Sequence, residues 1–181
     1  MKVIFLDIDG VLNNLEEVLH PVDSDIDYSL PQPKHLDVLK HIIDQTGAEI
    51  VLSSGWRLSL DGIQHVIDAL YPLGLTLRGV TPENVELSTL RMHGFDIQPC
   101  LYDKCRHEGN IETIVQDRGA QIAVWLMAHP EYTEFLILDD EVKDIKQYFP
   151  NNYIETDISK GLLPEHITSA IQILSGEKHE I

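Results

Sequence analysis

Short apolar runs alternate with amphipathic helical patterns along most of the chain, and this alternation limits the fold more than any other feature. Residues 2–7 form a run rich in β-branched and aromatic side chains, as expected of a strand buried on both faces. Comparable runs predict further strands at 48–52, 74–80, 135–138 and 153–156. Apolar residues at helical spacing predict helices through 36–43, 60–70, 122–126, 142–149 and 167–174. Strands that alternate with helices predict an α/β, Rossmann-like, three-layer α/β/α fold with a central, mostly parallel sheet.

The length of the chain suits one domain. A chain of 181 residues should bury about 70 % of the surface that its unfolded form exposes. Residues 81–117 have no clean period and hold prolines, glycines and both cysteines, which indicates an irregular insertion or lid. We therefore expect a single domain over residues 1–181, with this insertion at about 81–117.

The charge balance and the hydropathy pattern exclude several classes of partner. Thirty Asp and Glu against 13 Lys and Arg give a net charge of −17, which repels long phosphate polymers, so we expect no binding to duplex nucleic acid. No apolar run approaches the ~20 residues that a membrane span needs. Asp7 and Asp9 interrupt the first apolar run before it reaches the length of a signal peptide, so a cytoplasmic protein is expected.

Polar side chains follow three of the predicted strands at the points where these strands end. Ligands of such a sheet bind at the carboxyl ends of its strands. Several carboxylates at one edge repel one another unless a cation lies between them, and oxygen ligands without a nearby histidine favour Mg²⁺ over zinc. The candidate residues are Asp7, Asp9 and Gly10 after the first strand, Ser53, Ser54, Gly55, Trp56 and Arg57 after the second, and Asp139 and Asp140 after the fourth.

The order of these motifs resembles a known family. The segment 7–12, with sequence DIDGVL, resembles the first motif of the haloacid dehalogenase-like (HAD) superfamily, which contains aspartate-nucleophile phosphatases and phosphotransferases. A serine after the second strand, Arg118 at the start of a later helix and an acidic pair after the next strand follow in the family's order. The segments 52–57, 118–126 and 137–140 are similar to the HAD domain of Swiss Army knife RNA repair proteins. The resemblance extends across nearly the whole chain.

The resemblance implies roles for the first motif. Asp7 would be the nucleophile that forms an aspartyl-phosphate, and Asp9 would give a proton to the leaving oxygen and then take one from water. Gly10 suits the tight turn that must follow the strand. Asp7, the backbone carbonyl of Asp9, and Asp139 and Asp140 would bind Mg²⁺; which of the last two binds it directly is left open.

The resemblance also implies a set of residues that bind the substrate phosphate. Ser53 or Ser54 would bind the phosphoryl oxygens; Gly55 favours Ser54, but the adjacent pair leaves the register open by one residue. Arg118 would neutralise the transition state, where Lys is commoner in the family; the alternative is a solvent-facing residue in the first turn of a helix. Arg57 either binds a second anionic group of the substrate or pairs with an acidic residue of the protein. Trp56 either flanks the substrate or belongs to the core.

These roles together imply a Mg²⁺-dependent phosphomonoester hydrolase. Residues 12–33 are too few for a folded cap, so we expect no full cap domain and an open site. The expected substrate is a phosphorylated metabolite, a nucleotide or a nucleic-acid phosphate end; a phosphotransferase and a non-catalytic module with the same fold are the alternatives. Cys100 and Cys105, near His93 and His107, form a disulfide, part of a zinc site or, as we expect, a pair of reduced thiols.

Overall fold

A five-stranded parallel sheet forms the centre of the protein. The computed structural model describes residues 1–92, 94, 114–115 and 117–176. The strand order is β3-β2-β1-β6-β7, and every neighbouring pair is parallel. The strands are β1 (Lys2–Leu6), β2 (Glu49–Leu52), β3 (Leu77–Val80), β6 (Glu134–Asp139) and β7 (Tyr153–Glu155). The sheet predicted from the apolar runs is therefore confirmed.

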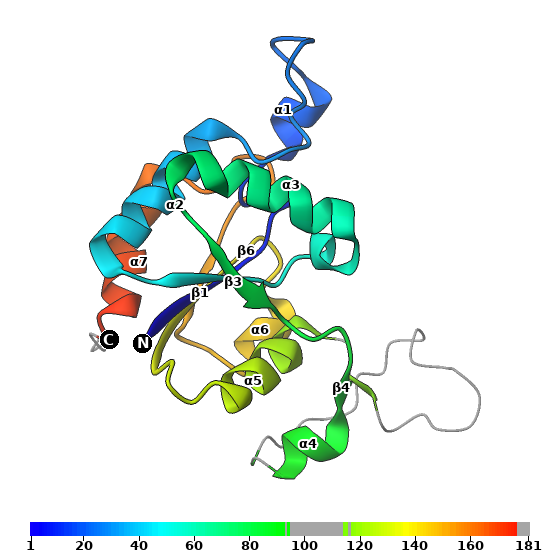
Figure 1. Ribbon diagram of the computed structural model, residues 1–181, viewed down its shortest axis with the longest axis vertical. Helices are drawn as coiled ribbons and strands as arrows, with labels where there is room; N and C mark the ends of the chain where they lie inside the picture. The colour runs from blue at the N-terminus through cyan, green and yellow to red at the C-terminus, as the bar shows by residue number, and fades with distance from the viewer. Residues whose placement is uncertain (93, 95–113, 116, 177–181) are drawn as a thin grey trace, which may run out of the picture.

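Helices cover both faces of this sheet, as Figure 1 shows. Ile4 and Leu6 of β1 belong to a core cluster shared with helices α2 (Pro33–Thr46), α3 (Leu60–Leu70) and α7 (Ile167–Leu174). Val3 and Phe5 point to the opposite face and pack with α5 (Arg118–Ala128) and α6 (Lys143–Lys146). Because successive side chains of a strand point to opposite faces, one apolar run supplies two cores. This arrangement confirms the predicted three-layer α/β/α fold.

Two local features differ from the predicted elements. The strand expected at 74–80 begins only at Leu77, because a 3-10 helix, η2 (Tyr71–Leu73), extends α3 and ends at Gly74, whose φ is +71°. Residues 12–33 contain a short helix, α1 (Leu15–Leu19), whose N-terminus is capped by the side chain of Asn14. The described residues also form the 3-10 helices η1 (Gly55–Leu58) and η4 (Pro164–His166).

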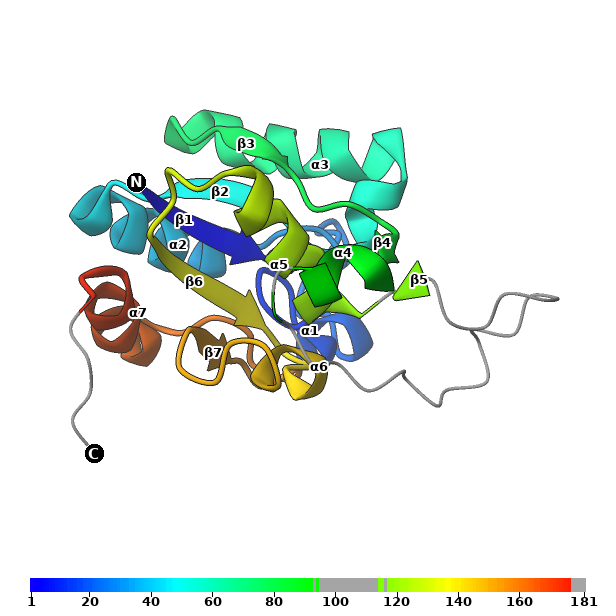
Figure 2. The ribbon, with the colours of Figure 1, turned by 90° about the horizontal axis from the view of Figure 1, so that it is seen from below.

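The described residues of the segment 81–117 include regular secondary structure. Its described residues form β4 (Val85–Glu86), α4 (Leu87–Met92) and β5 (Ile114–Val115), and β4 pairs with β5 in antiparallel orientation. This small sheet lies beyond the end of the main sheet to which the arrowheads of β1 and β6 point (Figure 2). The pairing of β4 with β5 brings residues near the two ends of the segment together. Cys100, Cys105, His93 and His107 lie outside the described residues.

Across the part of the chain that the structure describes, every helix is too short or too polar to span a bilayer.

Candidate active site

Asp7 lies at the carboxyl edge of the sheet, directly after its central strand. The register pairs Leu6 of β1 with Leu52 of β2 and with Leu138 of β6. The ladder continues one residue further, since the Asp7 amide donates to the Leu138 carbonyl at 3.0 Å and the Ser53 amide donates to the Leu6 carbonyl at 2.9 Å. Residues that alternate with Phe5 share its face of the sheet. Asp7 and its neighbours on the flanking strands therefore point toward the face covered by α5.

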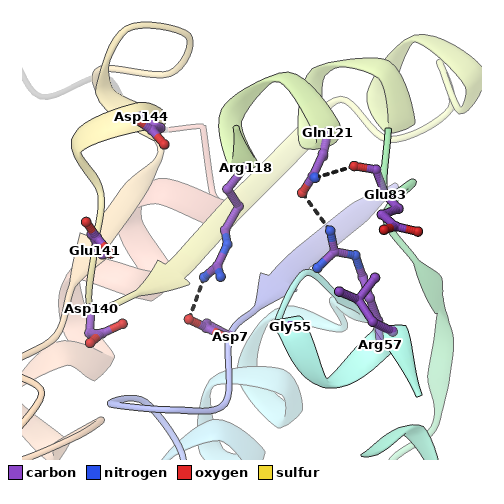
Figure 3. Close-up of a pocket in the computed structure, with 10 residues that line it drawn as sticks. Asp7, Gly55, Arg57, Glu83, Arg118, Gln121, Asp140, Glu141 and Asp144 are labelled. Atoms are coloured by element: carbon purple, nitrogen blue, oxygen red, sulfur yellow. Dashed lines mark hydrogen bonds and ion pairs between the residues drawn. The ribbon is translucent and has the colours of Figure 1, made fainter. Parts of the chain in front are cut away.

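The side chain of Arg118, at the start of α5, contacts the carboxylates of Asp7 and Asp139. Its Nη1 donates to Oδ2 of Asp7 at 2.5 Å and also to Oδ2 of Asp139, and Figure 3 shows the first of these contacts. The helix begins at this point because Asp117 caps it, accepting a hydrogen bond from the Ala120 amide at 2.6 Å. The alternative of a solvent-facing Arg118 is thus excluded by its two carboxylate contacts.

The same contacts and the burial of the site shift the pKa values of its groups. Burial raises the pKa of Asp139 to about 7; the charge of Asp7 adds to this rise, and Arg118 opposes it. Burial and the charge of Asp7 also raise the pKa of Asp140. Burial disfavours the charged guanidinium of Arg118, but the two carboxylates outweigh this effect and raise its pKa. The site thus has more negative charge than one arginine balances.

The acidic group fits a hard divalent cation. One carboxylate oxygen from each of Asp7, Asp139 and Asp140 lies within 4.8 Å of the others. Asp7 and Asp139 are buried and Asp140 is half-buried, and all three offer the oxygen ligands that Mg²⁺ prefers. Three carboxylates and one guanidinium leave a negative excess that a divalent ion would neutralise. The donor set therefore suits Mg²⁺.

Gly10 keeps Asp140 close to the turn that follows Asp7. The φ of Gly10 is +69°, in the left-handed region that a side chain disfavours. A Cβ atom at this position would lie 2.6 Å from Cγ of Asp140. The Gly10 carbonyl accepts a hydrogen bond from Oγ1 of Thr156 at 2.7 Å, which ties this turn to the end of β7. Glycine is therefore required here both for the backbone and for the position of the acid.

A pocket of about 340 Å³ opens above these residues. Asp7 and Arg118 lie between its two sides, with Asp140 and Glu141 on one side and Arg57 and Gln121 on the other (Figure 3). The pocket, the carboxylates and the guanidinium together form a site that can hold an anionic group next to the Asp7 carboxylate.

The two adjacent serines after β2 have different surroundings. Ser53 is fully buried, and its Oγ has no hydrogen-bond partner among the described residues. Ser54 is the N-cap of η1, where its Oγ accepts a hydrogen bond from the Trp56 amide at 3.4 Å. The strand register places Ser53, rather than Ser54, beside Asp7.

Among the described residues, Arg57 forms no ion pair with an acid, and hydrogen bonds occupy its guanidinium. It donates to the backbone carbonyls of Ser53 at 3.0 Å, Ser54 at 2.6 Å and Thr81 at 3.1 Å. It also donates to Oε1 of Gln121 at 2.7 Å. Burial, together with the nearby Arg118, lowers its pKa. Its hydrogen bonds fix the loop after β2 against the end of β3 and against α5.

Asp9 lies apart from the buried acids and is exposed to solvent. Its Oδ1 accepts a hydrogen bond from Nδ2 of Asn13, and its Oδ2 accepts one from Nε1 of Trp56, each at 2.9 Å. Trp56 also packs, half-buried, against the main core. The ring of Trp56 thus contacts the core, as one alternative expected, and its N–H points to the first motif.

Several residues of the site were missed by sequence reasoning. Asn13 could have been identified as an amide side chain four residues after Asp9. Gln121 could have been identified because it lies one helical turn after Arg118. Gln121 donates to the Glu83 carbonyl at 2.7 Å and so connects α5 to the start of the segment 81–117. Glu83 itself lines the pocket without a sequence signal that distinguishes it from other surface acids.

Comparison with known families gives one match, and it covers most of the chain. Residues 3–167 match the family described as the HAD domain in Swiss Army Knife RNA repair proteins. No curated protein and no solved structure matches the chain. The matched range contains every candidate residue described above, from Asp7 to Asp140. The chain therefore belongs to the family of HAD domains found in Swiss Army Knife RNA repair proteins.

Proposed function

We propose that the protein is a Mg²⁺-dependent phosphomonoester hydrolase that works through an aspartyl-phosphate on Asp7. At the level of the superfamily, membership of the HAD family supports a phosphatase-type hydrolase. The observation that carries the proposed mechanism through Asp7 is the Arg118 guanidinium, which is held between Asp7 and Asp139 at the floor of the pocket. A cation beside a nucleophilic carboxylate is the arrangement that stabilises a phosphoryl group during transfer.

Two displacements at phosphorus make up the reaction. In the first, an Asp7 oxygen attacks phosphorus, the bond from phosphorus to the ester oxygen breaks, and Asp9 gives its proton to that leaving oxygen. In the second, water attacks the aspartyl-phosphate, Asp9 takes the proton of that water, and the bond from phosphorus to Asp7 breaks. Inorganic phosphate and a free Asp7 carboxylate remain. Asp9 is thereby returned to its protonated form.

The other residues bind and orient the phosphoryl group. Arg118 neutralises the charge of its oxygens, and Ser53 or Ser54, with the backbone at Gly55, binds them. Arg57 holds this loop through the carbonyls of Ser53 and Ser54. Mg²⁺, when bound by Asp7, Asp139, Asp140 and the backbone carbonyl of Asp9, supplies charge neutralisation for the phosphoryl oxygens.

The substrate carries a phosphate monoester as its terminal group. The family description names RNA repair, which supports a nucleic-acid phosphate end, while the net charge of −17 opposes long polyanions and supports a nucleotide or a small phosphorylated metabolite. We further propose that the protein acts in the cytoplasm as one domain, with the segment 81–117 as a lid beside an open site.

The test is phosphate release from p-nitrophenyl phosphate, with Mg²⁺ and with the metal removed by a chelator. Asp7→Asn is expected to abolish hydrolysis, and Asp9→Asn to reduce it strongly. Asp44→Asn, at an exposed helix position paired with Lys40, is the matched control and is expected to keep full activity. Activity that persists in Asp7→Asn, or that is unaffected by the chelator, would overturn the proposal.

A further inference from the structure

The carboxyl group of Asp9 is held by two donors that come from different parts of the chain. Asn13 follows it in the same loop, whereas Trp56 belongs to η1, after the second strand of the sheet. We propose that the indole N–H of Trp56 positions Asp9 for proton transfer and stabilises the negative charge that appears on Asp9 when its proton leaves. This inference rests on the proposed function, because it assigns a task only if Asp9 is the acid.

The direction of the Trp56 N–H is fixed by the surroundings of the indole. The ring packs half-buried against the main core and makes an edge contact with His65 of α3, with centroids 6.2 Å apart. The backbone is fixed as well, since the Trp56 amide donates to Oγ of Ser54, and a Cβ on Gly62 would lie only 2.3 Å from the Trp56 carbonyl oxygen. A donor held in this way is already in place before the reaction begins.

Trp56 is a more specific donor to Asp9 than Asn13 is. Nδ2 of Asn13 donates both to Asp9 and, at 2.6 Å, to the Ser29 carbonyl, and its Oδ1 accepts from the Gly10 amide at 3.0 Å. Asn13 therefore supports the whole turn. The side chain of Trp has a single donor, and here that donor is directed to Oδ2 of Asp9.

The Trp56 N–H can donate to the Asp9 carboxyl group both before and after its proton is transferred. Each carboxyl oxygen has two lone-pair positions, so an oxygen that carries the transferable proton still accepts from an N–H. When the proton passes to the leaving oxygen, the bond becomes a charge-assisted one and strengthens. The contact is therefore stronger after proton transfer than before it, which is the condition for lowering the barrier of that step.

The leaving group provides the test. An alkyl phosphate expels a strongly basic oxygen that needs the proton of Asp9, whereas 2,4-dinitrophenyl phosphate expels a weakly basic one that does not. We measure kcat/KM for both esters, because this ratio reports the steps up to formation of the aspartyl-phosphate. Trp56→Phe keeps an aromatic ring without the N–H. It is expected to lower kcat/KM for the alkyl ester about tenfold and that for the dinitrophenyl ester less than about twofold.

Two further variants distinguish the effect of the N–H donor from the effect of ring packing. Replacement of Trp56 by β-(3-benzothienyl)alanine keeps the shape of the indole and removes only the N–H, and should reproduce the selective loss even if Trp56→Phe folds poorly. His65→Phe keeps a ring against Trp56 and leaves its N–H in place, so it is the matched control and should leave both rates unchanged.

Asp9→Asn distinguishes failure of this inference from failure of the proposed function. One outcome is that Asp9→Asn lowers kcat/KM for the alkyl ester selectively while Trp56→Phe and the benzothienylalanine protein do not. In that case Trp56 does not position Asp9, and the inference is overturned. Equal losses on both esters in the N–H-deficient proteins also overturn it, because they indicate a structural effect. If Asp9→Asn itself slows both esters equally, the assignment of Asp9 as the acid fails, and this inference fails with it.

Discussion

Ser53 and Ser54, the two candidates for binding the phosphoryl oxygens, differ in their position relative to Asp7 because of one residue of register. Ser53 lies beside Asp7, and its hydroxyl has no hydrogen-bond partner within the described part of the chain, while the hydroxyl of Ser54 caps η1. We predict that Ser53→Ala weakens binding of inorganic phosphate about tenfold, because one hydrogen bond to a charged group is lost. Ser54→Ala should chiefly lower the free energy of unfolding, by about 1 kcal/mol. Isothermal titration with phosphate and urea unfolding measure the two effects; the reverse assignment of losses would refute the role given to Ser53.

Gly10 and Gly47 form a matched pair for separating backbone strain from a steric clash. Their φ values are +69° and +67°, but a Cβ on Gly47 would meet nothing within 4 Å, whereas one on Gly10 would meet Asp140. Gly47→Ala should cost about 1–2 kcal/mol of the free energy of unfolding, as expected for a left-handed residue.

Gly10→Ala should cost more than Gly47→Ala and should also weaken Mg²⁺ binding, since the clash displaces Asp140. Denaturant unfolding and metal titration on both variants check this expectation. Equal destabilisation, with unchanged metal affinity in Gly10→Ala, would show that the approach of Asp140 to Gly10 has no consequence for the site.

At the scale of elements, the close packing of α5 on α6 depends on Gly119. A Cβ at this position would lie 2.3 Å from Cδ2 of Tyr148 and 2.7 Å from the Asp144 carbonyl oxygen. Alanine favours a helix over glycine by about 1 kcal/mol, yet overpacking costs about 1–3 kcal/mol. We predict that Gly119→Ala destabilises the protein and lowers kcat, because displacement of α5 also moves Arg118. Thermal unfolding and steady-state kinetics test this; a variant more stable than the wild type would contradict the close packing.

The order of the elements was predictable, because strand periodicity and helical spacing are local properties of the sequence. The position of the acids at the carboxyl edge followed from the rule that parallel strands end at the same side of a sheet. Which of the two serines lies beside Asp7 was not predictable, since it depends on the pairing of Leu6 with Leu52. Two neighbouring apolar runs do not by themselves determine this register. The hydrogen bond from Trp56 to Asp9 was not predictable either, because it joins η1 to the turn after β1, two segments that are far apart in the sequence.

At the scale of the whole molecule, one buried histidine couples stability to pH. His35 of α2 is fully buried; its Nδ1 lies 2.7 Å from the Leu162 carbonyl, and its Nε2 lies 3.2 Å from Nδ2 of Asn14. Since the amide nitrogen can only donate, Nε2 accepts and Nδ1–H donates, which is the neutral tautomer. Burial lowers the pKa of His35, and the bond to Leu162 opposes this change.

The sign of the effect on stability follows from proton binding. Below pH about 6.5 the unfolded chain binds a proton on His35 that the folded protein resists, so the free energy of unfolding should fall as the pH decreases from about 7 to 5. For one proton the slope is at most about 1.4 kcal/mol per pH unit. His35→Gln should have a shallower dependence than the wild type, whereas His41→Gln, at an exposed position of the same helix, should keep it. Urea unfolding at several pH values measures the slopes; identical slopes in wild type and His35→Gln would exclude this coupling.

The central place of β1 in the sheet has a consequence for local unfolding. β3 and β7 are edge strands, whereas β1 is hydrogen-bonded on both sides, to β2 and to β6. Fluctuations that open a sheet begin where the fewest bonds must break. The amide hydrogens of β1 should therefore be among the slowest in the protein to exchange with deuterium, and the strand that carries Asp7 should stay intact while the edges of the sheet open and close around it.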